Sequence, residues 1–151
     1  MKTLCMVGLG YIGLPTAAVF AKHGVKVKGF DISEHAVNTI NQGKIHIEEP
    51  GLEELVKEVV EAGMFSAYTT PQEADAFIMA VPTPFKGDDH EPNLDYIESA
   101  TRNLAKVLKK GDLVILESTS PVGTTEKMSY AHNPYGDGNA CNKIIHYLKN
   151  N

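Results

Sequence analysis

Three glycines near the start of the chain have the spacing of a phosphate-binding turn. Gly8, Gly10 and Gly13 form a Gly-x-Gly-x-x-Gly run between an apolar segment at 3–7 and an Ala-rich segment at 12–21. In such a turn the first glycine allows a tight bend, the second lets the backbone approach a pyrophosphate, and the third lets the following helix pack on the sheet. The first N–H groups of that helix then point at the phosphates. The run predicts a dinucleotide site, and the alternative is a glycine-rich surface turn without a ligand.

An acidic residue, Asp31, indicates which dinucleotide would bind. It ends the apolar segment at 25–30 and follows Gly13 at close to the spacing of roughly 20 residues expected for the group that binds the adenosine ribose. A carboxylate there accepts hydrogen bonds from the ribose hydroxyls and repels a 2′-phosphate, and residues 32–34 include no Arg to hold such a phosphate. The sequence therefore predicts NAD rather than NADP. The alternative is that Asp31 only caps the following helix, a role for which Ser33 is better placed.

Two later loops also carry polar residues directly after apolar, strand-like segments. The VPTP loop at 81–84 includes Thr83, whose hydroxyl could contact the ribose or a phosphate, although two prolines would also make it a rigid connecting turn. The loop at 117–125 is rich in Ser and Thr; it is either an N-cap cluster or a place that holds a nicotinamide or orders a water. We favour a site because ligands bind at the carboxyl ends of strands in doubly wound sheets.

The segments that position these residues alternate between strand and helix patterns. Strands are predicted at 3–7, 25–30, 65–69, 76–81 and 113–116. Helices are predicted at 12–21, from the Ser33 cap to residue 40, onward from Pro50, and from the Asn93 cap to Gly111. Such alternation implies right-handed crossovers between parallel strands. We therefore predict an α/β fold, a Rossmann-type doubly wound and mostly parallel sheet.

Composition and charge exclude several classes of function. The chain has 151 residues, the length of one domain, and 42% of them are hydrophobic. A net charge of −5 with scattered lysines leaves no basic patch for nucleic acid, and no apolar run approaches the roughly 18 residues of a membrane span. The start of the chain has no signal-peptide pattern, and two cysteines, one inside a predicted strand, indicate reduced thiols and a cytoplasmic location. The six histidines are dispersed, so no metal site is predicted.

Five segments together carry a family resemblance. They are GLGYIGLPTAA, FDIS, INQGKIHIEEPGLEELV, AVPTPFKGDDHEPNLDYIESA and LVILESTSPVGTTEKM. In this order, over roughly residues 1–128, they resemble the amino-terminal domain of the UDP-sugar 6-dehydrogenases, the UDP-glucose/GDP-mannose dehydrogenase family. The last two segments most resemble the members that act on UDP-N-acetyl-D-mannosamine.

The resemblance implies a chemistry and a set of site residues. Such enzymes oxidise the C6 alcohol of a UDP-sugar to a carboxylate with two NAD and a covalent intermediate on a catalytic Cys. The implied cofactor contacts are the backbone of Tyr11 and Ile12 at the pyrophosphate, Asp31 at the ribose, Val81 and Thr83 along the cofactor, and Thr119 and Thr124 near it. Thr119 is also the one catalytic candidate, because the resemblance implies that it helps to order the water of the second step.

The resemblance stops near Met128. The family's Cys motif, its Lys and Asn helix and its second domain have no counterpart in the sequence, and neither Cys5 nor Cys141 lies in the motif. We therefore expect a single truncated NAD-binding domain at 1–128 and a tail at 129–151. We also expect weak self-association through the face that the missing part leaves bare, or cover of that face by the tail.

The tail itself has two interpretations. Residues 132–138 and the apolar positions after them resemble the carboxyl-terminal end of non-hydrolysing UDP-N-acetylglucosamine 2-epimerases, which predicts a fusion of two genes. The alternative is an unrelated tail with a turn and a short helix.

Three functions fit the sequence. The first is the NAD-binding part of a UDP-sugar 6-dehydrogenase, which takes a UDP-sugar only if the missing half is supplied and is inactive alone. The second is a non-catalytic NAD-binding module. The third is another dehydrogenase, such as a 3-hydroxyacid type, against which the loops after 81 and 117 argue.

Overall fold

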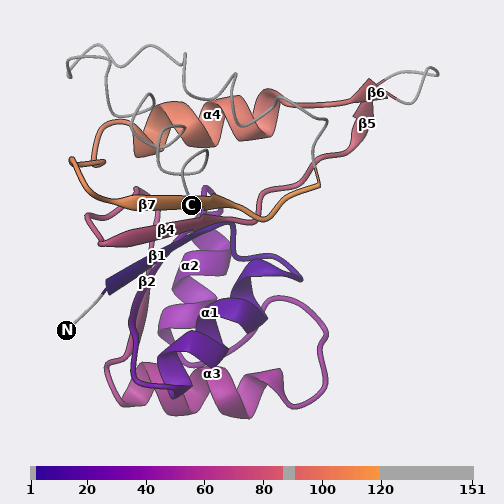
Figure 1. The fold of residues 1–151 in the computed structure, drawn as a ribbon. Helices are drawn as coiled ribbons and strands as arrows, with labels where there is room; N and C mark the ends of the chain where they lie inside the picture. Colours follow the sequence, from indigo (N-terminus) through magenta and orange to yellow (C-terminus); the bar gives the residue numbers. More distant parts are fainter. Residues whose placement is uncertain (1–2, 87–90, 120–151) are drawn as a thin grey trace.

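A parallel sheet forms the centre of the molecule (Figure 1). The structure, a computed structural model, describes residues 3–86 and 91–119. The five strands are β1 (Thr3–Val7), β2 (Lys26–Phe30), β3 (Phe65–Tyr68), β4 (Ala76–Met79) and β7 (Leu113–Leu116). Their order is β3-β2-β1-β4-β7, and every neighbouring pair is parallel. The strand order reverses between β1 and β4, and the carboxyl ends at such a point are where doubly wound sheets bind ligands. The predicted Rossmann-type sheet is confirmed.

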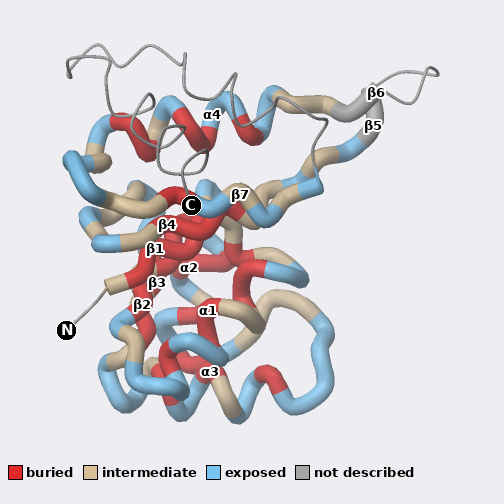
Figure 2. Tube along the Cα trace, in the orientation of Figure 1, coloured by how far each residue is buried: buried red, intermediate tan, exposed pale blue. Residues whose placement is uncertain are grey.

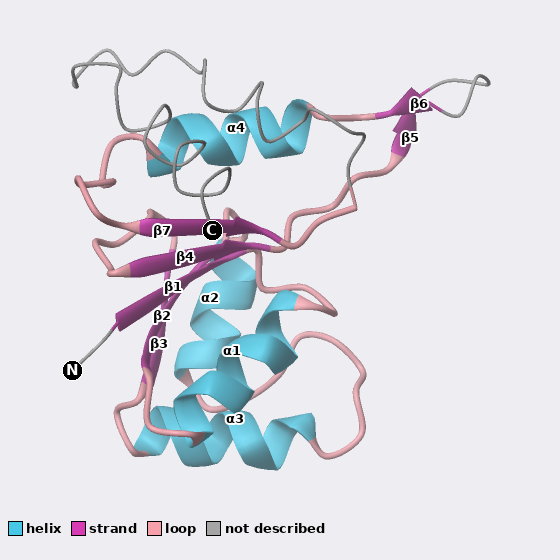
Figure 3. Ribbon diagram, in the orientation of Figure 1, coloured by secondary structure: helices cyan, strands magenta, loops and turns pink. Residues whose placement is uncertain are grey.

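Helices cover the two faces of this sheet unequally (Figure 3). One face carries α1 (Gly13–Lys22), α2 (Glu34–Asn41) and α3 (Leu52–Glu61), whereas α4 (Asp95–Leu104) lies over the opposite face. In the part of the chain that the structure describes, no helix has both the length and the apolar character needed to span a membrane.

The alternation of side chains along β1 explains these two layers. Leu4 and Met6 are buried in the core beneath α1, α2 and α3, and Cys5 and Val7 are buried in the core beneath α4. Because successive side chains of a strand point to opposite faces, a continuous apolar run supplies both cores. The buried residues accordingly lie along the sheet and on the inner sides of the helices (Figure 2).

Local signals set the start of α2 as predicted. The Ser33 hydroxyl accepts a hydrogen bond from the Ala36 N–H at 3.2 Å, which satisfies one of the free donors of the first turn. At α3, by contrast, the residue before the helix is Gly51 with a φ of 76°. The helix therefore starts at Leu52, after the left-handed Gly51, and not at Pro50 as predicted.

The helix predicted from Asn93 to Gly111 is shorter in the structure. Regular α4 ends at Leu104, and the Val107 N–H donates to the Leu104 carbonyl at 2.9 Å in a tighter turn. The Asp112 carboxylate then accepts from the Lys109 N–H at 2.8 Å. Such a side chain offers the backbone a partner outside the helix, which explains the early end.

The sequence did not predict a small ladder before α4. Strands β5 (Phe85–Lys86) and β6 (Glu91–Pro92) pair antiparallel. Strands of two residues leave no periodic pattern to detect. The ladder separates the VPTP loop from α4 and so brings the chain back over the sheet.

Candidate dinucleotide-binding site

The glycine-rich turn joins β1 to α1, and its three glycines have different surroundings. Gly8 has a φ of +89°, and a Cβ added there would lie 2.6 Å from the Ala80 carbonyl oxygen. A Cβ added at Gly13 would lie 1.8 Å from the Gly8 carbonyl oxygen. A Cβ added at Gly10 would meet no atom within 4 Å. The fold itself requires the first and third glycines, whereas the second borders open space.

The start of α1 presents free backbone donors beside Gly10. Its N-cap, Ile12, makes no side-chain capping bond. Among the described residues, none accepts a hydrogen bond from the N–H groups of Tyr11, Ile12 or Gly13. Unpaired N–H groups and the positive end of the helix dipole together make an anion-binding position.

The Asp31 carboxylate connects this turn to the end of β2. Its Oδ2 accepts from the Leu9 N–H at 2.8 Å, and its Oδ1 accepts from the Ser33 N–H at 2.9 Å. Ser33, and not Asp31, caps α2. Each carboxylate oxygen has capacity for a second hydrogen bond, so the group can still accept from a ligand.

A single cleft of about 820 Å³ collects most of the predicted site residues. It is lined by Gly8, Gly10, Tyr11, Ile12, Asp31, Val81, Thr83 and Thr119, among others. Its volume falls within the range of about 300–1,000 Å³ typical of ligand sites. Gly13 lies behind the turn instead of in the cleft wall. Thr124 and Cys141 lie outside the described residues.

The two polar loops predicted from the sequence meet at one side of the cleft. The Ser118 hydroxyl donates to the Val81 carbonyl at 2.7 Å, and the Glu117 N–H donates to the Met79 carbonyl at 2.9 Å. Ser118 therefore holds the loops together. The hydroxyl-bearing residues Thr83 and Thr119 line the cleft.

One helix contributes cleft residues that the sequence did not single out. Tyr96, Ser99, Ala100 and Asn103 of α4 line the cleft with the spacing of one helix face. Ile97 and Leu104 of α4 form its core face, and the polar positions beside that face were the signal that the sequence offered. From the strands, only Val7 of β1 and Phe30 of β2 join this wall. Phe30 and Ala100 also belong to the core beneath α4, so α4 and the end of β2 that leads to Asp31 border the same cleft.

Two titratable groups with shifted pKa values, the buried Cys5 and the half-buried His46, lie outside the cleft wall. Burial raises the pKa of the Cys5 thiol to about 11, which makes this cysteine a poor nucleophile. Burial also lowers the pKa of His46, although the nearby Asp31 carboxylate opposes that shift. The His46 Nδ1 is buried with no hydrogen-bond partner among the described residues. Within the same residues, no cluster of side chains could hold a metal ion.

Comparisons with known proteins agree with this geometry. Residues 2–144 match the "UDP-glucose/GDP-mannose dehydrogenase family, NAD binding domain". The UDP-N-acetyl-D-mannosamine dehydrogenase of Campylobacter jejuni is 68% identical over 126 residues, which are 83% of this chain and 31% of that enzyme. The enzyme of the same name from Escherichia coli K12 is 65% identical over 127 residues, 84% of this chain and 30% of that enzyme.

Solved structures show the same similarity. The UDP-N-acetyl-mannosamine dehydrogenase of Staphylococcus aureus aligns with a TM-score of 0.80 and 44% identity, over 83% of this chain and 31% of that one. The GDP-mannose dehydrogenase of Pseudomonas aeruginosa aligns with a TM-score of 0.80 and 29% identity, over 93% of this chain and 32% of that one. This chain thus spans about 30% of the length of the relatives that it matches. The resemblance read from the five sequence segments is confirmed for the dehydrogenase part.

Proposed function

The chain belongs to the UDP-glucose/GDP-mannose dehydrogenase family and carries its NAD-binding domain, and we propose that it binds NAD in the cleft at the carboxyl edge of the sheet. The observation that carries this assignment is the open space at Gly10 beside the unpaired N–H groups of α1. A pyrophosphate can approach the backbone closely only where no side chain intervenes. The residues present therefore fit the cofactor.

Asp31 is proposed to bind the adenosine ribose. Its two oxygens already accept one backbone hydrogen bond each, which fixes the carboxylate at the cleft wall. Two ribose hydroxyls can donate to the remaining lone pairs. A 2′-phosphate in the same place would meet a fixed negative charge, so the site should prefer NAD over NADP.

The adenine is proposed to lie against α4. Ser99, Ala100 and Asn103 line the same cleft as Asp31 and Phe30, and Ala100 and Phe30 share one core cluster. The adenine is attached to the ribose on the side away from the pyrophosphate. Ala100 offers a flat apolar contact, while the side chains of Ser99 and Asn103 can exchange hydrogen bonds with the edge of a base. Tyr96, which is 45% exposed, adds an aromatic surface at the mouth of this region.

The nicotinamide half is proposed to lie toward the β4 and β7 loops. Val81, Thr83 and Thr119 line the cleft, and the hydrogen bond from Ser118 to the Val81 carbonyl holds their two loops together. Thr124 is assigned to the same end from the sequence alone. When bound, NAD supplies a hydride acceptor there. The Thr119 side chain is exposed, and its hydroxyl can hold a water by donating one hydrogen bond and accepting another.

The substrate is proposed from the relatives. Those with 59–68% identity are named for UDP-N-acetyl-D-mannosamine or NDP-N-acetyl-D-galactosaminuronic acid. The function that we propose for the chain is the cofactor-binding part of an enzyme that oxidises C6 of UDP-N-acetyl-D-mannosamine. We place the sugar site and the nucleophile in the part of these relatives that this chain does not match, because Cys5 is buried with a raised pKa and Cys141 does not lie in the family's motif.

The cofactor assignment can be tested by calorimetric titration with NAD and NADP. We expect NAD to bind at least ten times more tightly than NADP. Asp31→Ala should weaken NAD binding by about 1–3 kcal/mol, because charge-assisted hydrogen bonds to the ribose are lost. The matched variant Asp31→Asn keeps the shape but removes the charge, so it should narrow the difference between the two cofactors. Equal affinity of the unmodified chain for NAD and NADP would refute the role of Asp31.

A further inference from the structure

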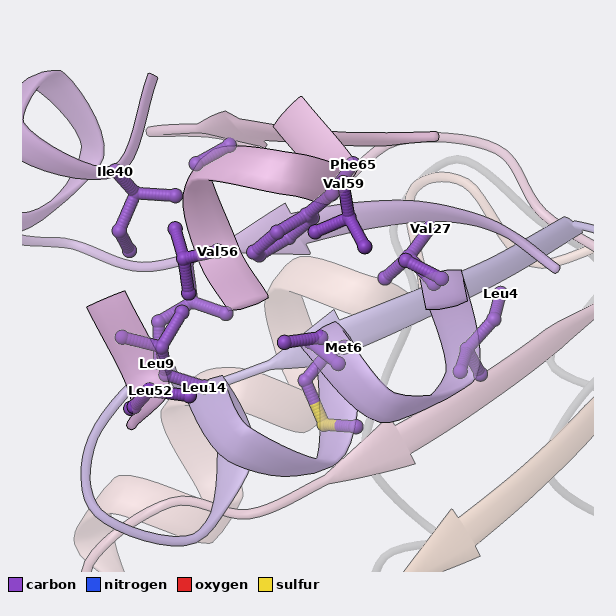
Figure 4. Close-up of a cluster of buried hydrophobic side chains, with 14 of the residues drawn as sticks. Leu4, Met6, Leu9, Leu14, Val27, Ile40, Leu52, Val56, Val59 and Phe65 are labelled. Carbon is purple, nitrogen blue, oxygen red and sulfur yellow. The ribbon is translucent and has the colours of Figure 1, made fainter. Parts of the chain in front are cut away.

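Leu9 separates the two glycines of the turn that face the cleft, but its own side chain points the other way. It is fully buried, with an exposed fraction of 0%. The side chain belongs to the core beneath α1, α2 and α3, together with Leu14 and Leu52 (Figure 4). A loop residue buried to this extent fixes the loop, because moving its backbone would withdraw the side chain from a close-packed core.

The place that Leu9 occupies exists because β2 has a glycine. A Cβ added at Gly29 would lie 2.8 Å and 2.9 Å from the two terminal methyl carbons of Leu9, and 3.0 Å from Cε2 of Phe65. Gly29 is not among the glycines with a positive φ. The strand backbone therefore accepts any residue at this position, and it is the space already filled by the Leu9 methyl groups and the Phe65 ring that favours glycine.

The backbone around Leu9 is attached to the same strand end. The Leu9 N–H donates to Asp31 at 2.8 Å, and the Gly8 N–H donates to the Phe30 carbonyl at 2.8 Å. Three consecutive residues thus hold the turn: Gly29 by the space it leaves for Leu9, Phe30 by its carbonyl and Asp31 by its carboxylate. A displaced Leu9 side chain would pull on both hydrogen bonds and on Gly10, the next residue.

We propose that Gly29 is a positioning residue for the dinucleotide site, acting through Leu9. Its missing side chain leaves room for the Leu9 methyl groups, and the seated Leu9 holds the Gly10 backbone where a pyrophosphate can meet it. This inference rests on the proposed binding of NAD in the cleft. It adds a residue outside the glycine run. Gly29 lies in β2, and its Cβ position faces the core that holds Leu9 and Phe65.

The test is a size exchange between the two positions. Gly29→Ala adds one carbon and Leu9→Val removes one, so the double variant keeps the core volume, a kind of change that cores tolerate best. We expect Gly29→Ala to weaken NAD binding at least tenfold. The calorimetric titration is run at a temperature well below the melting temperature of the variant. Leu9→Val combined with Gly29→Ala should restore the affinity to within about threefold of the unmodified chain.

A control separates positioning from general loss of stability. Ala21→Val crowds the same core at the last turn of α1, away from the glycine run, so it should lower the melting temperature without changing NAD affinity. The amide chemical shifts of Gly10, Tyr11 and Ile12 give a second readout without cofactor: Gly29→Ala should move them and the double variant should return them. If Gly29→Ala alone does not fold, the double variant must fold and bind NAD as the unmodified chain does.

Two results would overturn the inference, and each differs from failure of the proposed function. Gly29→Ala could bind NAD with unchanged affinity and unchanged turn shifts, or the double variant could bind as weakly as Gly29→Ala. In both cases NAD still binds the unmodified chain. If the unmodified chain bound no NAD, the proposed function would fail, and the amide shifts would still decide whether Gly29 positions the turn.

Discussion

At the scale of single residues, three glycines of one motif are required for different reasons. Gly8 and Gly13 are enforced by contacts within the fold, because a Cβ at either would overlap a carbonyl oxygen. Gly10 has no such contact, so only a ligand would be excluded by a side chain there. The sequence predicted all three from their spacing. It could not separate their roles, because those depend on distances in the folded chain, from Gly8 to the Ala80 carbonyl and from Gly13 to the Gly8 carbonyl.

Asp31 shows the same limit of sequence reasoning. Its position at the end of a strand predicted a ribose contact. The structure adds that the carboxylate accepts from Leu9 and Ser33, a role that depends on how residues 9 and 31 meet in space. The alternative that Asp31 only caps α2 is wrong, because Ser33 is the N-cap of that helix, and the ribose contact stays a prediction.

His46 gives a pH dependence to stability. Burial lowers its pKa in the folded chain, with Asp31 opposing and His35 adding to the shift. The unfolded chain takes up the proton near the ordinary value of about 6.5, before the folded chain does. The free energy of unfolding should therefore fall as the pH drops from above 6.5 through the folded pKa.

The measurement is urea denaturation at pH 7.5 and at pH 5.5. His46→Gln should reduce the difference between the two midpoints. An unaltered difference in His46→Gln would show that His46 is not the group responsible.

At the scale of elements, sequence patterns located the strands and helices better than their ends. Continuous apolar runs predicted the strands of the sheet, and the Ser33 cap predicted the start of α2. The prediction that α4 extends to Gly111 was wrong, because hydrogen bonds from the 107 and 109 amides leave the helix pattern after Leu104. The α4 wall of the cleft was missed because a sequence shows which residues share a helix face, but not which pocket that face meets.

The proposed contact between α4 and the adenine predicts the effect of filling this wall. Ser99→Leu places a larger side chain in the cleft at an exposed position, so it should lower the affinity for both NAD and ADP-ribose at least tenfold while the melting temperature changes little. Arg102→Leu lies on the same helix outside the cleft wall and serves as the matched control. Unchanged binding of ADP-ribose to Ser99→Leu would place the adenine elsewhere.

At the scale of the whole molecule, the chain carries the NAD-binding domain of its family. It spans about 30% of the relatives' length. The predicted boundary between the domain and the tail falls outside the described residues, and so does the tail of the predicted gene fusion. The predicted self-association concerns a second copy of the chain. All three stay predictions. Among the described residues, the loops that follow β1, β2, β4 and β7 line the dinucleotide cleft, and none of them is assigned to a uridine or a sugar.

The 151-residue chain should accordingly not turn over a UDP-sugar. Nucleophilic catalysis requires a thiolate held against C6 in fixed geometry, and the remaining groups of a catalytic unit contribute little once the nucleophile is lost. Incubation with NAD and UDP-N-acetyl-D-mannosamine should give no NADH above background in absorbance. Turnover that Cys141→Ser abolishes would contradict this expectation, and Cys5→Ser provides the matched control.

The most direct test of the proposed site compares NAD binding by the unmodified chain and by Gly10→Ala. The structure leaves room for this methyl group in the absence of ligand, so Gly10→Ala should keep its melting temperature and still lose at least tenfold in NAD affinity, which corresponds to about 1.4 kcal/mol. Gly13→Ala, whose Cβ meets the Gly8 carbonyl, should instead lose about 1–3 kcal/mol of folding stability. A folded Gly10→Ala chain that binds NAD as tightly as the unmodified chain would contradict a pyrophosphate at this turn.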